Sequence, residues 1–203
     1  MATARLTRAE RREQTRDDLV AAADRRFVDG GFHATSLDQI AADAGYTKGA
    51  VYSNFASKED LFFAVYERRA ARAAAEMAEL FAADPADGLE RISADTSARR
   101  NRDDGWLAAF FEFWAHVIRH PELRARFASI HRRLQEPVAE ALERVAARRG
   151  VELPDAALPL AVAAGAMQIG LALERLTQPE IVDDELGMRM GRVLLDEIQR
   201  RKG

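Results

Sequence analysis

The chain has 203 residues, of which 48% are hydrophobic, and its formal net charge is −3. This length can bury a sizeable core, and the composition excludes a disordered chain. The small acidic net charge argues against a protein that coats polyanions along its whole surface, and the lack of cysteine excludes disulfides and thiolate metal sites.

Positive charge is concentrated at the start of the chain. Residues 1–58 carry nine Lys and Arg against eight Asp and Glu, whereas the remainder carries 21 against 25. A basic leading end on an acidic body is typical of a small nucleic-acid contact surface. Because the N-terminus is charged where a secretion signal needs an apolar stretch, we expect a cytoplasmic protein.

Apolar residues recur at helical spacing, and strand-like alternation is nearly absent. We therefore predict an all-α fold of about nine helices. The predicted helices cover about 8–29, 36–44, 47–54, 58–82, 85–98, 105–119, 121–149, 155–176 and 183–201, with residues 101–105 as a loop.

Local chemistry marks several boundaries near the N-terminus. The pair Gly30–Gly31 ends the first helix, and Ser36 forms a capping box with Gln39 at the start of the second. Gly45 ends that helix, and Thr47 caps the third. We divide the chain into a three-helix head over 1–55 and a larger helical body over 56–203.

Two short helices joined by a tight turn with a glycine form a helix-turn-helix, whose second helix can enter the major groove of DNA. Lys48 can pair with a phosphate or a guanine edge, Gly49 lets the backbone approach the duplex, and the Tyr52 hydroxyl suits a phosphate oxygen. The glycine-turn spacing alone leaves open a small helical subdomain with merely solvated polar residues. The predicted DNA contacts are Ser36, Thr47, Lys48, Gly49, Tyr52, Ser53 and Lys58.

A longer pattern narrows these alternatives. Residues 19–65, "LVAAADRRFVDGGFHATSLDQIAADAGYTKGAVYSNFASKEDLFFAV", resemble the DNA-binding head of the TetR family of bacterial transcriptional regulators. The resemblance implies that the predicted contacts meet double-stranded operator DNA, with Arg5 and Arg8 near the adjacent minor groove. Tyr46 departs from the family pattern, where a small aliphatic residue is common. The sequence leaves open whether Tyr46 only packs or alters the entry of the recognition helix.

Five of the chain's aromatic residues fall within 106–114, where they cover most of one predicted helix. Core packing explains most of these rings. The family resemblance adds a cavity in the body for a small, mostly apolar effector. The candidate lining residues are Phe62, Met77, Phe81, Trp106, Phe110, Phe113, Trp114, His116 and Met167.

Residues 156–173 carry no charge and reach the lower limit of membrane-span length. Because they are rich in Ala and Gly, we expect a helix buried on all sides and no membrane partner. Small residues here, and the apolar repeat over 183–201, predict a homodimer through a four-helix interface. The predicted interface residues are Gly165, Ala166, Ile169, Gly170, Leu173, Leu186, Met190, Leu194 and Ile198.

These features together predict a ligand-responsive transcriptional regulator, specifically a repressor released from a palindromic operator when its effector binds. We expect no cofactor, no metal and no catalytic residues. One alternative is a metal-dependent or hydrolytic enzyme that uses Glu112, His116 and His120, which are spaced to share one helix face. A second is a sequence-indifferent DNA-coating protein with the same head.

Overall fold

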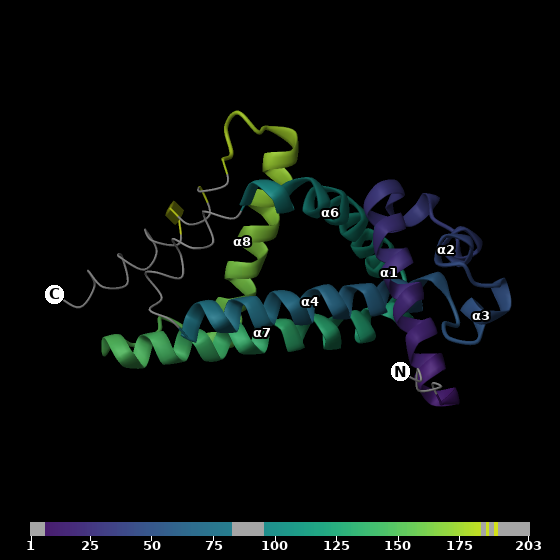
Figure 1. Ribbon diagram of the computed structural model, residues 1–203. Helices are drawn as coiled ribbons and strands as arrows, with labels where there is room; N and C mark the ends of the chain where they lie inside the picture. The colour runs from purple at the N-terminus through teal and green to yellow at the C-terminus, as the bar shows by residue number, and fades with distance from the viewer. Residues whose placement is uncertain (1–6, 83–95, 184–185, 187–188, 191–203) are drawn as a thin grey trace, which may run out of the picture. The chain divides into compact units, whose positions relative to one another are not determined.

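The computed structural model describes residues 7–82, 96–183, 186 and 189–190 (Figure 1). All regular structure in these ranges is helical, which confirms the all-α prediction. The predicted helices over 85–98 and 183–201 lie largely outside the described residues. The seven described helices are α1 (Arg8–Ala34), α2 (Leu37–Ala44), α3 (Lys48–Tyr52), α4 (Lys58–Ala82), α6 (Thr96–Arg119), α7 (Pro121–Arg149) and α8 (Ala157–Thr177).

The chain forms two compact units. One comprises residues 1–69 and 102–121, and the other comprises residues 70–101 and 122–203. The first unit therefore holds α1 to α3, the beginning of α4 and most of α6. It extends beyond the head predicted over residues 1–55, because α4 and α6 both supply parts of its core. Each of these two helices runs on from one unit into the other.

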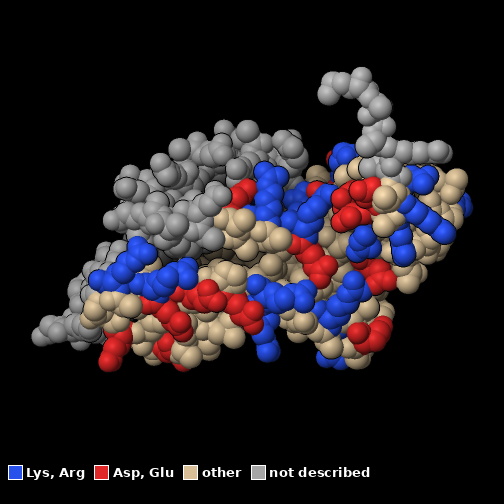
Figure 2. All heavy atoms as spheres, turned by 60° about the horizontal axis from the view of Figure 1, so that its bottom comes forward, with Lys and Arg blue, Asp and Glu red and all other residues tan. Residues whose placement is uncertain are grey.

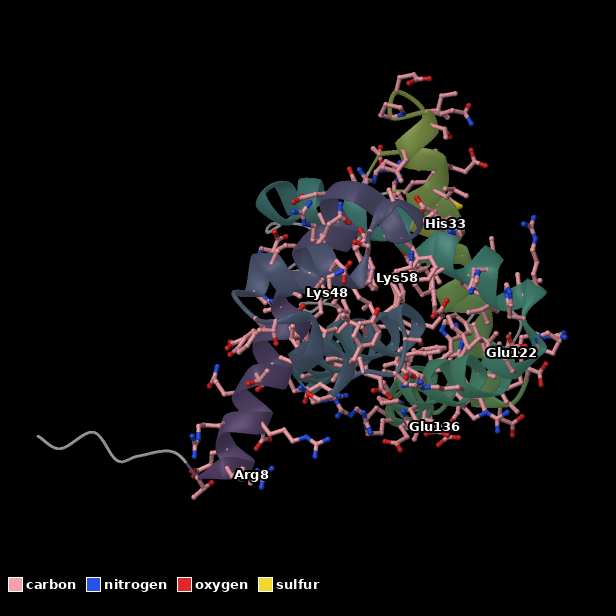
Figure 3. All side chains as sticks on the ribbon, turned by 90° about the vertical axis from the view of Figure 1, so that its right-hand side faces the viewer. Arg8, His33, Lys48, Lys58, Glu122 and Glu136 are labelled. Atoms are coloured by element: carbon pink, nitrogen blue, oxygen red, sulfur yellow. The ribbon has the colours of Figure 1, made fainter. Side chains whose placement is uncertain are left out.

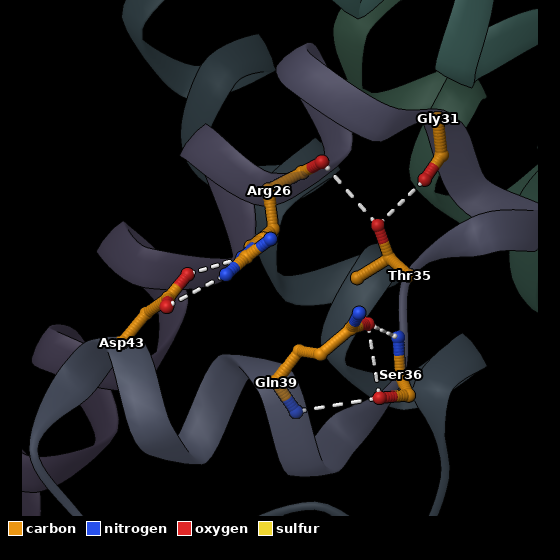
Figure 4. A network of polar contacts seen from close by, with 6 residues as sticks. All are labelled: Arg26, Gly31, Thr35, Ser36, Gln39 and Asp43. Atoms are coloured by element: carbon orange, nitrogen blue, oxygen red, sulfur yellow. Dashed lines mark hydrogen bonds and ion pairs between the residues drawn. The ribbon is translucent and has the colours of Figure 1, made fainter.

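The predicted caps around α2 and α3 are confirmed. The Ser36 hydroxyl accepts a hydrogen bond from the backbone N–H of Gln39, and the Gln39 side chain accepts one from the backbone N–H of Ser36 (Figure 4). Gly45 closes α2 with a φ of 75°, in the left-handed region that favours glycine. Thr47 caps α3 by accepting a hydrogen bond from the backbone N–H of Ala50. These caps fix where both short helices begin.

The predicted break at Gly30–Gly31 is confirmed, although helical residues continue beyond it, whereas the predicted loop over residues 101–105 was wrong. The helical segment of α1 extends to Ala34 and is interrupted at Gly31, whose φ and ψ are 77° and 175°. Residues 101–105 belong to α6, which begins at Thr96. Gly105 is a packing glycine rather than a loop glycine, because an added Cβ would lie 2.4 Å from the carbonyl oxygen of Val28 in α1.

Aromatic rings form the core of the first unit. Phe62 of α4 lies against Phe27 and Phe32 of α1, with ring centroids 4.9 Å and 5.4 Å apart. Phe113 of α6 stacks on Phe62 at 4.1 Å. All four rings are buried. Burial of this apolar area against α1 holds the beginning of α4 and the end of α6 to the helix that supports α2 and α3.

In the second unit, α7 and the first turns of α8 share a small core that includes Ala139, Ala157 and Ala161. The rest of α8 is largely open, and Val162 and Leu173 are exposed. The prediction of a helix buried on all sides was therefore wrong for the single chain. In the described part of the chain, α8 alone is long and apolar enough to cross a membrane, judged by length and composition only.

Candidate nucleic-acid interface

The helix-turn-helix has a buried inner side and an exposed outer side. Ile40 of α2 and Val51 of α3 have no exposed surface, so they fix the two helices against each other. On the outer side, Tyr52 is 58% exposed although its ring is large and apolar. Tyr52 therefore presents both its ring and its hydroxyl to a ligand that approaches this side of α3.

Lys48 lies at the first position of α3 (Figure 3). Its ammonium pairs with the Asp38 carboxylate of α2. This pairing raises the pKa of Lys48, chiefly through the hydrogen bond to Asp38. Both side chains are exposed. Exposed ion pairs are weak, so a DNA phosphate can replace Asp38 as the partner of Lys48. The pair holds the Lys48 ammonium at the exposed surface shared by α2 and α3.

Gly49 has free space around its backbone. An added Cβ would meet no atom of the described chain closer than the Thr47 hydroxyl, 3.8 Å away. The fold therefore does not require glycine here. A requirement for glycine at this position would come from a partner that approaches the α3 backbone.

The two serines predicted at the interface have intramolecular hydrogen bonds. The hydroxyl of Ser36 forms the α2 cap with Gln39. The hydroxyl of Ser53 donates to the Ala50 carbonyl, at 2.9 Å. Ser36, Thr47 and Ser53 are all exposed, so each can still contact a ligand through its remaining lone pairs.

Lys58 is held by contacts with the end of α1. Its ammonium donates to the carbonyl oxygens of Phe32, at 2.7 Å, and His33, at 3.3 Å, and lies 4.3 Å from the centre of the Phe32 ring (Figure 3). Burial is the main cause that lowers its pKa. In this structure the half-buried Lys58 caps the end of α1, and its contact with DNA stays a prediction. Sequence reasoning missed this role because Lys58 and α1 are distant in the sequence.

Tyr46 connects the turn before α3 to α1. Its hydroxyl donates a hydrogen bond of 2.8 Å to the Asp18 carboxylate, which also accepts one of 2.9 Å from the Gln14 side chain. Tyr46 immediately precedes Thr47, the cap of α3. This contact answers the question left open by the sequence, because Tyr46 does more than pack. It ties the entry of α3 to the supporting helix.

Arg16 holds the other end of α3. Its guanidinium lies 4.4 Å from the centre of the Phe55 ring and donates to the Asn54 carbonyl at 3.3 Å. Arg8 is exposed at the first residue of α1, whereas Arg5 lies outside the described residues (Figure 3). On the face shown in Figure 2, Lys and Arg are interspersed with Asp and Glu rather than gathered in one basic area.

The family models decide the classification. Residues 19–65 match the model described as bacterial regulatory proteins of the tetR family, and residues 85–200, more than half of the chain, match the C-terminal model of BetI-type transcriptional repressors. The chain belongs to the TetR family. This confirms the resemblance found in the head and extends it to the second half of the chain.

Two curated relatives of this TetR-family chain are named regulators. It is 30% identical over 129 residues to the transcriptional repressor AcnR of Corynebacterium diphtheriae, and the match covers 64% of each chain. It is 35% identical over 112 residues to the transcriptional activator FasR of Mycolicibacterium smegmatis, covering 55% of this chain and 44% of FasR. The chain thus matches less than two thirds of the length of either relative.

Solved structures show the same fold. The structure of a transcriptional regulator from Rhodococcus sp. RHA1 matches 92% of this chain and 96% of its own, with a TM-score of 0.71 and 24% identity. Salmonella enterica GusR matches 96% of this chain and 98% of its own, with a TM-score of 0.68 and 17% identity. These likenesses establish the TetR-family architecture alone.

The residues predicted to line an effector cavity fall into several groups. Phe62 and Phe113 are fully buried in the aromatic core of the first unit, which favours the core-packing interpretation for both. The half-buried Trp106 and Trp114 lie on α6 in the same unit, as do Phe110 and His116. Met167 belongs to α8 in the second unit. The side chains of Met77 and Phe81 lie outside the described residues.

Each residue proposed for the enzyme alternative makes polar contacts within the chain. Glu112 accepts a hydrogen bond from the His33 backbone at 2.9 Å, and His116 Nε2 lies 3.3 Å from a Glu59 carboxylate oxygen. His120 Nδ1 lies 2.7 Å from the His116 carbonyl. Within the described ranges, no group of three His, Asp or Glu residues is arranged to hold a metal ion. The geometry therefore gives the metal alternative no support.

The predicted dimer residues on α8 remain accessible in the single chain. An added Cβ at Gly165 or Gly170 would meet no atom of the described chain within 4 Å. Ala166 and Leu173 are exposed, and Ile169 is half-buried. Leu186 and Met190 fall in the short described stretch that follows, whereas Leu194 and Ile198 lie outside it.

Proposed function

We propose that this chain is a DNA-binding transcriptional regulator that reads an operator with the exposed side of α3. The observation that carries the proposal is the combination of a buried α2–α3 contact with an exposed Lys48, Gly49 and Tyr52. Such a helix can enter a major groove while its supporting helices stay packed. Thr47, Ser36, Ser53 and Lys58 are proposed as additional contacts.

A dimer would allow the protein to bind two half-sites of an operator at once. The open surface of α8, with Gly165, Gly170 and Leu173, can receive a second copy of the same helix. Paired heads related by a two-fold axis bind two half-sites about 34 Å apart, so the operator is a palindrome. The proposed assembly is a homodimer that blocks transcription while bound, which makes the chain a repressor.

The proposed effector is a small, mostly apolar molecule that favours the DNA-free state. Support comes from the half-buried rings of Trp106 and Trp114 on α6, a helix that runs through both units. About 100-fold tighter binding to the DNA-free state corresponds to roughly 2.7 kcal/mol of coupling. The two residues are the chain's only tryptophans, so quenching of their fluorescence reports effector binding.

The DNA proposal is tested with a duplex enriched from randomised double-stranded DNA by repeated binding to the wild-type protein. Lys48→Ala and Tyr52→Phe should weaken binding, and each lost phosphate contact should reduce the salt slope by about one unit. Gly49→Ala should weaken binding while the helix itself becomes more stable by roughly 0.5–1 kcal/mol, because alanine favours helix.

Glu136→Ala supplies the matched control, since Glu136 is an exposed residue of α7. It should leave the affinity for the enriched duplex unchanged. Transcription from a promoter that contains the duplex should fall when the protein is present. Wild-type affinity in all three α3 variants would contradict the proposed interface, and increased transcription would contradict repression.

A further inference from the structure

The end of α1 is broken at Gly31 and held there by other helices. Phe32 has almost no exposed surface, and His33 follows it with an exposed side chain. Because Gly31 is not helical, the backbone around Phe32 and His33 needs partners beyond those of a regular helix. These partners come from α4 and α6, the two helices that run on into the second unit.

Glu112 of α6 is the partner for the backbone N–H. One oxygen of its carboxylate accepts the hydrogen bond of His33 at 2.9 Å. The other lies where a Cβ on Gly31 would come within 2.5 Å. Gly31 therefore leaves the room that the carboxylate occupies, besides adopting a φ of 77° that favours glycine.

Lys58 of α4 is the partner for the carbonyl groups. Its ammonium donates to the carbonyl oxygens of both Phe32 and His33 and lies above the Phe32 ring. An acidic side chain from α6 and a basic side chain from α4 thus hold the same dipeptide through its N–H and its two carbonyls. Bonds of this kind, in which one partner is charged, are stronger than neutral ones.

The held dipeptide lies directly before the DNA-reading helices. Thr35, two residues after His33, is buried, and its hydroxyl donates to the Gly31 carbonyl at 2.8 Å (Figure 4). Ser36 then caps α2. Only Ala34 and Thr35 separate His33 from this cap. A shift of the dipeptide is therefore passed to the start of α2 through a short, hydrogen-bonded connection.

We propose that Glu112 is a positioning residue for DNA binding, which together with Lys58 sets the start of α2 and ties it to α6. Rotation or sliding of α6 would withdraw the carboxylate from the His33 N–H and loosen the head. This inference rests on the proposed function, because it assumes that α2 and α3 bind DNA. It gives Glu112 a role different from the metal ligand considered from the sequence.

The test compares Glu112→Ala, Glu112→Gln and the control Glu136→Ala on the enriched duplex. Glu112→Ala removes the acceptor and should lower the affinity about tenfold, the loss expected for one hydrogen bond to a charged group. Glu112→Gln keeps an acceptor oxygen and should stay within about threefold of the wild type. Lys58→Met releases the dipeptide from the other side and should also lower the affinity.

A second measurement separates positioning from simple loss of stability. Trp106 and Trp114 lie on α6, so saturating duplex should change tryptophan emission in the wild type through the Glu112 connection. The emission change should be lost in Glu112→Ala, whose helical circular dichroism should match the wild type. A Glu112→Ala protein that does not fold is replaced by the Lys58→Met variant in both measurements.

Wild-type affinity and a full emission change in Glu112→Ala would overturn the inference, and so would an equal loss in Glu112→Gln. If Lys58→Met has to replace Glu112→Ala, wild-type affinity together with a full emission change in Lys58→Met would overturn the inference. If the wild-type protein enriches no duplex at all, the proposed function fails instead. The two failures are therefore distinguishable.

Discussion

Tyr46 and Tyr52 form a natural pair for a test of the head, because Tyr→Phe removes only a hydroxyl at each position. The Tyr46 hydroxyl is half-buried and donates to Asp18 at 2.8 Å, whereas Tyr52 is exposed on α3. We expect Tyr46→Phe to reduce the free energy of unfolding and Tyr52→Phe to leave it unchanged. The DNA affinity should fall in both variants, for different reasons.

The expected size follows from the geometry. A hydrogen bond contributes about 0.5–1.5 kcal/mol net, and more when one partner is charged. In Tyr46→Phe, Asp18 keeps the Gln14 side chain as a donor at 2.9 Å. Because Asp18 is only half-buried, water can replace the lost tyrosine hydroxyl and reduce the cost of the substitution. We expect a cost of about 1 kcal/mol for Tyr46→Phe. For a chain of this length this lowers the melting temperature by about 2–4 °C.

Urea unfolding followed by circular dichroism measures the loss of unfolding free energy in Tyr46→Phe. A double-mutant cycle with Asp18→Ala shows whether this loss comes from the hydrogen bond to Asp18. If the hydroxyl acts through Asp18, the two substitutions should be non-additive by about 1 kcal/mol. Additive effects, or an unfolding free energy that Tyr46→Phe does not change, would refute the tie between the α3 entry and α1. Tyr52→Phe run in parallel shows that loss of a tyrosine hydroxyl alone has no such effect.

Three further predictions concern the remainder of the molecule. Phe113→Ala should cost about 3–5 kcal/mol in urea unfolding, because the ring is fully buried in the aromatic core; a loss below about 1 kcal/mol would contradict that role. Burial lowers the pKa of His131 below its usual 6.5, so the unfolded chain takes up the proton first and stability should fall as the pH drops below about 6.5. His131→Gln should lessen this fall in pH-dependent unfolding, and an identical pH profile would refute it. Gly170→Asp should keep the helical content, since no described atom is near, but should give monomers in sedimentation; an intact dimer would place the interface elsewhere.

The sequence predicted best those features that depend on neighbouring residues. The capping box at Ser36, the left-handed Gly45 and the Thr47 cap each need only residues within one helical turn. For the same reason the exposed side of α3 could be expected from its polar residues. The resemblance to the TetR family, carried by residues 19–65, rests on these same local patterns.

Features that depend on distant parts of the chain could not be predicted. Glycine is common in loops, so Gly105 was predicted in one. Only the close approach of α1 in the structure shows that glycine is needed there for packing. Glu112 and His116 share a helix face and so suggested a metal site, but Glu112 accepts a hydrogen bond from the His33 backbone whereas His116 lies beside Glu59 of α4. Lys58 was predicted only as a DNA contact, because its bond to the Phe32 carbonyl joins residues that are distant in the sequence. The exposure of apolar residues on α8 likewise depends on how distant helices pack against it, which its own sequence does not show.

The central claim, that α3 reads a palindromic operator in a dimer, is tested most directly by sequencing the duplexes enriched from a randomised pool. The account predicts an inverted repeat whose half-site centres lie about 34 Å apart, roughly one turn of the DNA helix. Enrichment of that repeat should disappear when the selection is repeated with Lys48→Ala. Recovery of unrelated sequences by the wild-type protein, or of the same repeat by Lys48→Ala at equal yield, would contradict the claim.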